Sequence, residues 1–317
     1  MINLSIVIPH FNNSKLLETL LLSIPNRSDI EVIVVDDYSD SSEFLKIQNL
    51  YSSKKYKFSL YQNNSIKSAG TCRNIGMSYI SGKWVLFADS DDYFSKDFYE
   101  SISIYFNSKN DVVFFKPTSV YIDSNTLADR HEKICKRLDK YLNNKNLENL
   151  LTIKYKLETP WSKLINNNFL ITNSIKFEEV IASNDLLFST KVGYSMSLFE
   201  ISSDTIYVTT RNHNSLTLKL TIDIFETRLN EKIKYFIYLK ERLSQEEIKM
   251  LNISFLDFLI KSSNYEIKFF FSTLIMFIKR GLPIIDKRLF GINSLKDLLK
   301  TYMTMKKINK KYSTKEQ

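Results

Sequence analysis

The sequence predicts an α/β protein, with a mostly parallel sheet flanked by helices and a C-terminal module of helices. Three observations lead to this prediction. Short apolar runs of strand length alternate with helix-like periodicity over the first hundred residues, which is typical of repeated β-α-β units. Polar clusters directly follow several of these runs. After about residue 220 the pattern becomes helical, and the basic residues are concentrated in its later part.

The expected strands and helices follow one another along the chain. A buried strand at residues 4–8 ends at Pro9, and a helix with one apolar face then continues to Pro25, which terminates it. A second helix is expected from about residue 69 to 80. Residues 121–157 are polar, and we expect a loop and a helix inserted over the sheet there. Further strands are expected in four places: 31–35, 58–61, 84–88 and 111–115.

Composition limits the class of protein. The chain has 317 residues, of which 44% are hydrophobic, so it can bury a substantial core and is not mainly disordered. Two cysteines, Cys72 and Cys135, are too few for a secreted disulfide scaffold. The apolar run at residues 269–278 is shorter than the roughly 20 residues that cross a bilayer, and the N-terminus lacks the features of a signal peptide. We therefore expect a cytoplasmic protein.

The net charge of +9 is unevenly distributed. Residues 261–317 hold 13 Lys and Arg against 4 Asp and Glu, which accounts for the whole excess. We expect an α/β domain at residues 1–218 and a basic α-helical module at 219–317. Basic and apolar residues interleave in that module, which fits helices lying at an anionic membrane surface. A packing or homo-oligomerisation module with a basic rim is the alternative, and nucleic acid is not an expected partner because no known module is present.

The polar clusters lie at the expected carboxyl ends of strands, where ligands bind in sheets of this kind. They occupy residues 9–12, 36–37 and 89–92. The last cluster, Asp-Ser-Asp-Asp, places three carboxylates together, and these repel one another unless a cation joins them. Mg²⁺ is usually held by one or two carboxylates together with substrate phosphates. A helix cap followed by a solvated acidic turn is the alternative interpretation.

The pair Asp36-Asp37 also has two interpretations. It can cap a helix, or it can bind a nucleoside base or ribose, as carboxylates do in nucleotide-binding crevices. No G-x-G-x-x-G motif follows the first expected strand. Its absence argues against a nicotinamide or flavin cofactor.

Four motifs occur in a fixed order: IVIPHFN at 6–12, VVDDYS at 34–39, GTCRNIG at 70–76 and FADSDD at 87–92. Together they resemble the family 2 glycosyltransferases, which have the GT-A fold, and the resemblance extends over residues 2–215. It implies an inverting enzyme that transfers a sugar from a UDP-sugar to a hydroxyl of a glycan or lipid-linked saccharide. It also implies Mn²⁺ or Mg²⁺ as cofactor and a role in bacterial capsule, lipooligosaccharide or wall-glycan synthesis.

The resemblance assigns donor-binding roles position by position. Phe11 matches the aromatic residue that stacks on uracil, and Asp37 matches the acid that bonds the edge of the base. Arg73 matches a basic residue near the phosphates or ribose. Simple packing of Phe11 and a structural salt bridge of Arg73 are the alternatives. The full set implied to bind the nucleotide-sugar is Pro9, Phe11, Asn12, Asp37, Arg73, Asp89, Ser90 and Arg211.

The resemblance also implies which residues hold the metal ion. Asp89 and Asp91 match the D-x-D pair of the family, and Asp91 is the expected direct ligand. His213 lies where some family members use a histidine as a ligand, although an ordinary surface histidine is the alternative.

Asp185, within the segment SNDLLF at 183–188, matches the catalytic base of the family. Its carboxylate would accept the proton of the acceptor hydroxyl, and a helix-capping role is compatible with this. Asn184 stands where an acid is usual in the family, and Glu178 and Glu179 are the fallback bases. In the segment WSKL, residues Trp161 and Lys163 match a segment on the acceptor side, with core packing of Trp161 as the alternative.

Two other function classes remain open. The departures at Asn184 and at Ser68, where glycine is frequent, leave room for a non-catalytic nucleotide-sugar or glycan-binding protein on the same fold. A nucleotidyltransferase also uses acidic strand ends. Measuring UDP release with and without Mn²⁺ distinguishes a non-catalytic binding protein from an enzyme. Pyrophosphate formation from a nucleoside triphosphate would identify a nucleotidyltransferase.

Overall fold

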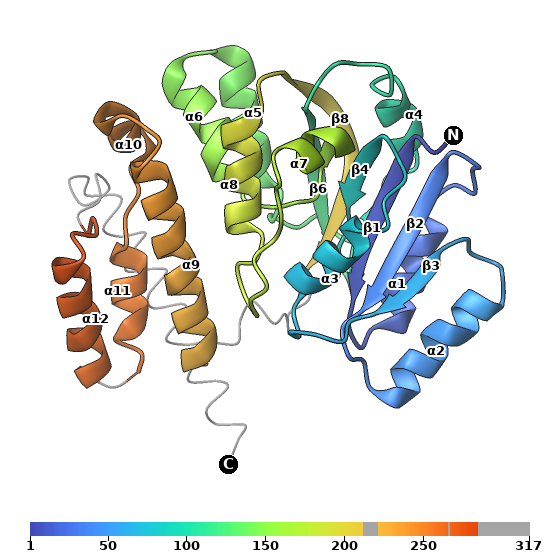
Figure 1. The fold of residues 1–317 in the computed structure, drawn as a ribbon, viewed down its shortest axis with the longest axis horizontal. Coiled ribbons are helices and arrows are strands. Elements are labelled where there is room, and N and C mark those ends of the chain that lie inside the picture. The colour runs from blue at the N-terminus through green and yellow to red at the C-terminus, as the bar shows by residue number, and fades with distance from the viewer. Residues whose placement is uncertain (212–220, 266, 285–317) are drawn as a thin grey trace. The chain divides into compact units, whose positions relative to one another are not determined.

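The computed structural model describes residues 1–211, 221–265 and 267–284 (Figure 1). His213 and 9 of the 13 Lys and Arg of residues 261–317 lie outside these ranges. The chain divides into two compact units, and the boundary falls between Tyr235 and Phe236. The expected boundary between residues 218 and 219 falls among residues that the structure does not describe, so that division stays a prediction.

The first unit is built on one eight-stranded sheet, in the order β3-β2-β1-β4-β7-β6-β8-β5. The strands β3, β2, β1 and β4 are parallel to one another. β7 is antiparallel to both of its neighbours, β6 and β8 are parallel, and β5 is antiparallel to β8. The strands are β1 (Leu4–His10), β2 (Ile30–Asp36), β3 (Ser59–Gln62), β4 (Trp84–Phe87), β5 (Tyr93–Phe94), β6 (Val112–Tyr121), β7 (Lys163–Asn166) and β8 (Phe199–Arg211).

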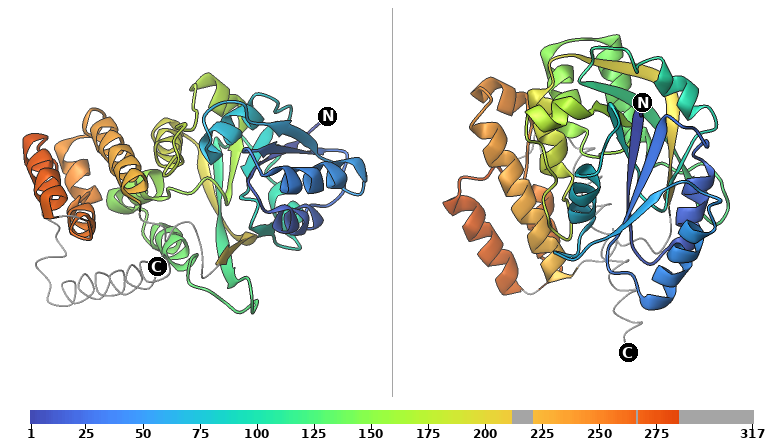
Figure 2. Two further views of the ribbon diagram at one scale, coloured as in Figure 1. Left: turned by 90° about the horizontal axis from the view of Figure 1, so that it is seen from below. Right: turned by 45° about the vertical axis from the view of Figure 1, so that its right-hand side comes forward.

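Helices cover both faces of this sheet (Figure 2), and each face has its own hydrophobic core. The first core includes residues of α1, α2 and α4, and the second includes residues of α3, α5, α6 and α8. β1 alternates between them, because Ile6 and Ile8 lie in the first core and Val7 in the second. The helices are α1 (Ser14–Leu22), α2 (Ser41–Ser52), α3 (Ala69–Met77), α4 (Phe98–Ser103), α5 (Glu132–Asn143), α6 (Leu147–Lys156), α7 (Asn167–Thr172), α8 (Leu186–Ser195) and α9 (Ile222–Lys240).

The α/β class and the flanking helices are therefore confirmed, with some local corrections. Residues 121–157 hold two helices, α5 and α6, and not the single helix expected there. The helix expected at 69–80 ends at Met77, and α2 was not expected. Antiparallel β7 lies in the middle of the sheet, so the parallel pattern of the first half does not continue through the second half.

The second unit contains the end of α9 followed by α10 (Gln245–Leu251), α11 (Leu256–Ser262) and α12 (Ile267–Lys279). Phe255 lies at its centre, with ring centroids 5.8 Å from Phe236 and 5.5 Å from Phe277. Ser244 and Glu247 form a capping box that begins α10. The predicted helical module is thus confirmed over the described ranges. Within them, every helix is too short or too polar to span a bilayer.

Candidate active site

The polar ends of β1, β2 and β4 lie side by side at one edge of the sheet. His10 at the end of β1 pairs in register with Asp36 at the end of β2. The amide of Ala88, just beyond β4, donates to the carbonyl of Val7 in β1. The parallel arrangement therefore brings the three predicted clusters together, as expected for the ligand-binding edge of such a sheet.

Asp36 is fully buried, and its carboxylate has a structural role. Its carboxylate accepts hydrogen bonds from His10 Nδ1 (3.0 Å), Ser39 N (3.0 Å) and Ser39 Oγ (2.5 Å). Burial alone would raise the pKa of Asp36, but these hydrogen bonds hold it below its ordinary value. Asp36 therefore fixes the loop that carries Asp37.

The predicted donor residues at β1 and β2 lie around this loop. Pro9 is buried within β1, whereas the Phe11 ring is 39% exposed and the ammonium of Lys67 lies 3.7 Å from its centroid. Asn12 has a left-handed backbone, with φ of 48°. Its side chain exchanges hydrogen bonds with Asp40, which joins the β1 and β2 loops.

Asp37 lies next to Asp36 and is also buried. Its Oδ1 accepts hydrogen bonds from Asn63 Nδ2 (2.8 Å) and from the amide of Ser68 (3.2 Å). Ser68 in turn caps α3, because its side chain accepts from the amide of Thr71. The carboxylate of Asp37 is therefore held at the N-terminus of α3.

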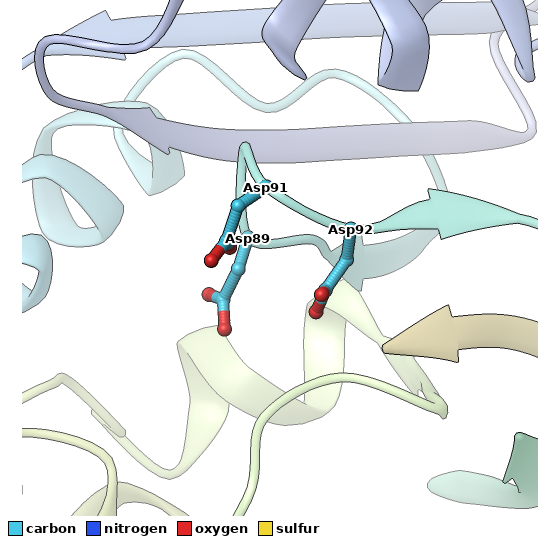
Figure 3. A group of neighbouring side chains, drawn as sticks. All are labelled: Asp89, Asp91 and Asp92. Carbon is cyan, nitrogen blue, oxygen red and sulfur yellow. The ribbon is translucent and has the colours of Figure 1, made fainter. Parts of the chain in front are cut away.

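Asp89, Asp91 and Asp92 form an acidic cluster in the turn after β4 (Figure 3). One carboxylate oxygen from each lies within 4.8 Å of the others. β8 supports this turn, since Tyr207 Oη accepts from the Asp89 amide (2.8 Å) and the Thr210 amide donates to Asp92 Oδ1 (2.7 Å). The structure thus brings the predicted D-x-D pair together and adds Asp92, which sequence reasoning did not assign as a ligand.

The environment of this acidic cluster disfavours its negative charge. Burial and the charges of Asp91 and Asp89 raise the pKa of Asp92 well above its ordinary value. Surrounding protein and the charge of Asp89 raise the pKa of Asp91 as well, although its side chain reaches solvent. Asp92 Oδ2 is buried without a hydrogen-bond partner among the described residues, which is costly for a carboxylate. A hard divalent cation with oxygen ligands suits this set of donors, so these three residues could hold Mn²⁺ or Mg²⁺.

Arg73 projects from α3 and is almost fully buried. Its Nη2 donates to Asp89 Oδ1 at 2.6 Å, and its Nη1 donates to Asn184 Oδ1 at 2.9 Å. The guanidinium carbon also lies 5.2 Å from the centroid of the Phe177 ring. The structure therefore shows Arg73 in a buried ion pair, which is the alternative that the sequence left open. Its role in nucleotide binding stays a prediction.

Asp185 lies at the start of α8, and its side chain makes no capping hydrogen bond. Burial raises the pKa of Asp185 to about 6, with contributions from the charges of Asp89 and Glu158 and an opposing one from Arg73. A carboxyl with such a pKa is suited to accept a proton near neutral pH. Arg73 bonds both Asp89 and Asn184, the neighbour of Asp185, so Asp185 lies near the acidic cluster and remains the candidate base.

The two fallback bases are already engaged. Glu178 makes ion pairs with Lys191 (3.4 Å) and Lys234 (3.2 Å), and Glu179 accepts from Asn74 Nδ2 at 3.1 Å. Both carboxylates are thus already held by other side chains of the protein. The geometry therefore favours Asp185.

The residues expected on the acceptor side lie in the core. Trp161 is 3% exposed and stacks on Tyr207, with ring centroids 5.4 Å apart. Lys163 is equally buried, and its Nζ donates to the Leu157 carbonyl (2.6 Å) and to Ser189 Oγ (3.2 Å). Burial lowers the pKa of Lys163 to about 7. Their roles at the acceptor stay predictions, and the structure shows the core packing that was the alternative for Trp161.

The remaining predicted residues are less closely associated with the acidic cluster. Ser90 is half-buried within the acidic turn. Arg211 is exposed at the end of β8 and pairs with Asp129. His213 lies outside the described residues, so its predicted role as a ligand stays open.

The mixed sheet and the acidic turn after β4 agree with the GT-A fold that the sequence motifs predict. Residues 5–170, just over half of the chain, match the sequence model of glycosyl transferase family 2. The chain belongs to this family, and the resemblance seen in the sequence motifs is confirmed.

The chain is similar to bacterial glycosyltransferases. The chain is 28% identical over 217 residues to the poly(ribitol-phosphate) beta-N-acetylglucosaminyltransferase TarS of Staphylococcus aureus strain MW2, covering 65% of this chain and 35% of TarS. It is 38% identical over 92 residues to the GalNAc(5)-diNAcBac-PP-undecaprenol beta-1,3-glucosyltransferase of Campylobacter jejuni, covering 28% of this chain and 29% of that protein. The matches thus span about a third of the length of these relatives.

Solved structures share the fold. The crystal structure of S. aureus TarS 1–349 in complex with UDP-GlcNAc superposes with a TM-score of 0.66, at 20% identity, over 98% of this chain and 92% of that chain. The mannosyltransferase PcManGT of Pyrobaculum calidifontis, in complex with GDP-Man and Mn²⁺, gives a TM-score of 0.51 at 12% identity over 78% of each chain.

Proposed function

We propose that this protein is an inverting glycosyltransferase that moves a sugar from a UDP-sugar to a hydroxyl of a glycan or lipid-linked saccharide. The observation that carries the proposal is the pairing of an acidic cluster with Asp185, a half-buried residue whose carboxyl pKa is raised to about 6. Membership of family 2 and the UDP-GlcNAc named in the TarS complex support a UDP-sugar donor. The relatives support a role in the synthesis of a bacterial surface glycan.

At the donor side, Phe11 offers an exposed ring on which a uracil could stack, and Asp37 lies nearby for the edge of the base. Asp89, Asp91 and Asp92 are the residues that would hold Mn²⁺ or Mg²⁺. Such an ion, when bound, supplies positive charge that offsets the negative charge of a departing diphosphate. Arg73 keeps Asp89 oriented through its buried ion pair.

At the acceptor side, Asp185 accepts the proton of the acceptor hydroxyl as its oxygen attacks the anomeric carbon. The new carbon–oxygen bond forms while the bond to UDP breaks, and UDP leaves with the bonding electron pair. Attack from the face opposite the leaving group inverts the anomeric centre. An α-linked donor therefore gives a β-glycoside.

The proposal is tested by measuring UDP release from a panel of UDP-sugars, with Mn²⁺, with Mg²⁺ and with EDTA. We expect release from at least one donor with either ion and loss of release with EDTA. UDP binding without turnover on any donor or glycan acceptor would instead support a non-catalytic binding protein. Pyrophosphate formed from a nucleoside triphosphate and a sugar phosphate would support a nucleotidyltransferase.

We also propose that α12 brings the protein to an anionic membrane surface. Its exposed apolar side chains are spaced by four, four and three residues, so they form one stripe along the helix. Lys268 and Lys279 lie in the same helix, Arg280 directly follows it, and residues 267–279 include no acid. Apolar and basic side chains together suit an anionic leaflet. The exposed residues, called the α12 stripe, are Ile267, Phe271, Ile275 and Ile278.

A further inference from the structure

Two loops of the site that are far apart in the sequence share one side chain. Arg73 donates to Asp89 in the acidic turn and to Asn184 in the segment that leads into Asp185. We propose that Arg73 and Asn184 form a positioning bridge, which couples the acidic turn to the segment carrying the base. The inference deepens the proposed function and rests on it for its catalytic consequence.

The bridge is buried at Arg73 and at Asn184 and half-buried at Asp89. Arg73 is 5% exposed and Asn184 is 8% exposed. A charged hydrogen bond of 2.6 Å is short and strong, and the 2.9 Å bond to the amide oxygen also has a charged donor. Removing a partner from a buried guanidinium leaves part of its charge uncompensated. Both loops therefore have a preferred position relative to Arg73.

Other contacts fix α3 against the same segment. The side chain of Asn74 donates to the Phe177 carbonyl (3.0 Å) and accepts from the Phe177 amide (2.9 Å). Gly70 comes so close that an added Cβ would lie 2.1 Å from the Glu178 carbonyl oxygen and 2.8 Å from Asn184 Cβ. The N-terminal half of α3 and residues 177–184 thus pack as one body, so a shift of this segment reaches Arg73.

An amide suits position 184 better than the acid that the family resemblance leads one to expect. Asn184 Oδ1 accepts from Arg73 while its Nδ2 donates to the Val180 carbonyl at 3.3 Å. A carboxylate could accept the first bond but could not donate the second. The amide is neutral, and Arg73 makes its ion pair with Asp89.

The bridge is tested by hydrogen exchange, followed by mass spectrometry, of the unliganded full-length protein. In Asn184→Ala we expect exchange to become several-fold faster both at residues 178–186 and at the acidic turn, residues 88–92. Asn184→Asp retains an oxygen for Arg73 Nη1 and should leave the acidic turn close to wild type. Faster exchange confined to residues 178–186 in Asn184→Ala would overturn the bridge.

Two further variants make this outcome specific. Asn149→Ala removes a similar amide in α6, where Asn149 Nδ2 donates to the Lys140 and Asn144 carbonyls, and should change neither segment. Asp89→Asn weakens the bridge from its other end and should speed exchange at residues 178–186. If Asn184→Ala does not fold, Asp89→Asn tests the bridge in its place. Unchanged exchange at residues 178–186 in Asp89→Asn would contradict the bridge.

The catalytic consequence is a separation of turnover from donor binding. Asn184→Ala should lower kcat by about 10- to 100-fold, since small displacements of a reacting group are costly. The Kd for UDP in the presence of Mn²⁺ should remain within about twofold. Equal losses in both quantities would indicate only general destabilisation and would overturn the positioning role. If wild type transfers no sugar, the proposed function fails, while the exchange experiment still decides the bridge.

Discussion

Asp185 shows how the surroundings of a side chain adapt it to a chemical role. It is the residue directly before α8, yet its carboxylate makes no capping hydrogen bond. Burial raises its pKa to about 6, whereas the nearby charge of Arg73 keeps the pKa from rising further. The carboxylate is thus a stronger base than an exposed aspartate and is still ionised at neutral pH.

The ionisation of Asp185 predicts a pH profile. Because the base must be ionised, kcat/KM for the donor should fall about tenfold per pH unit below pH 6 and level off above it. Steady-state UDP release measured from pH 4.5 to 8 checks this limb. Asp185→Asn should lower kcat by about 10²- to 10⁴-fold and abolish the limb, while UDP binding persists. Asp204→Asn, at an exposed position in β8, is the matched control and should retain the wild-type profile.

The contacts that several residues of the site make could not be predicted from the sequence. Arg73 and Asn184 are 111 positions apart, and no local periodicity reports a contact over that distance. Asp92 was visible as part of an acidic run, but its buried and unpartnered oxygen depends on β8 folding back over the turn. Lys163 lies in a strand of the core, where a charged residue is unusual. Its hydrogen-bond acceptors come from outside that strand.

At the level of elements, a strand was easier to predict from the sequence when its apolar pattern was continuous. β1, β2 and β4 are almost wholly buried, and their apolar runs ended at the polar clusters that form the site. β5 has two residues and β8 alternates irregularly between buried and exposed positions, so neither has a clear periodic signal. The donor half of the site was therefore easier to predict than the half that α8 and β8 complete.

The packing of α3 gives a prediction for a whole helix. Gly70→Ala would place a methyl group 2.1 Å from the Glu178 carbonyl oxygen, so α3 and residues 177–184 must move apart. We expect the free energy of unfolding to fall by about 1–3 kcal/mol, as in other overpacked sites. We also expect sugar transfer to fall more than UDP binding does. Urea unfolding and steady-state kinetics measure the two effects.

Ser78→Ala, at the exposed C-terminal end of the same helix, is the control for Gly70→Ala. It should change both quantities little. Wild-type stability and turnover in Gly70→Ala would show that α3 does not hold the segment in the way described.

At the scale of the whole molecule, the charge and the exposed apolar surface support binding at an anionic membrane surface. The net charge of +9 is carried by residues 261–317, and the α12 stripe adds exposed apolar side chains. Phe271→Ser with Ile275→Ser leaves the charge unchanged. We expect this double variant to lose at least half of the wild-type co-sedimentation with vesicles containing 30% anionic lipid, because less apolar surface enters the leaflet.

The control for the α12 stripe is Leu45→Ser, which removes an exposed apolar residue of α2 and should pellet like wild type. Vesicles of neutral lipid should retain little protein. If the double variant pellets like wild type but changes from a dimer to a monomer in light scattering, the α12 stripe is a contact between copies of the chain.

The ammonium of Lys67 above the Phe11 ring has a consequence for ligand choice. A base that stacks on this ring must displace the Lys67 ammonium. A nucleoside offers the displaced ammonium no anionic partner. A nucleotide has phosphates with which the displaced ammonium can form an ion pair. Uridine should therefore bind more weakly than UDP even without added metal. Lys67→Met should reduce the difference between the two Kd values.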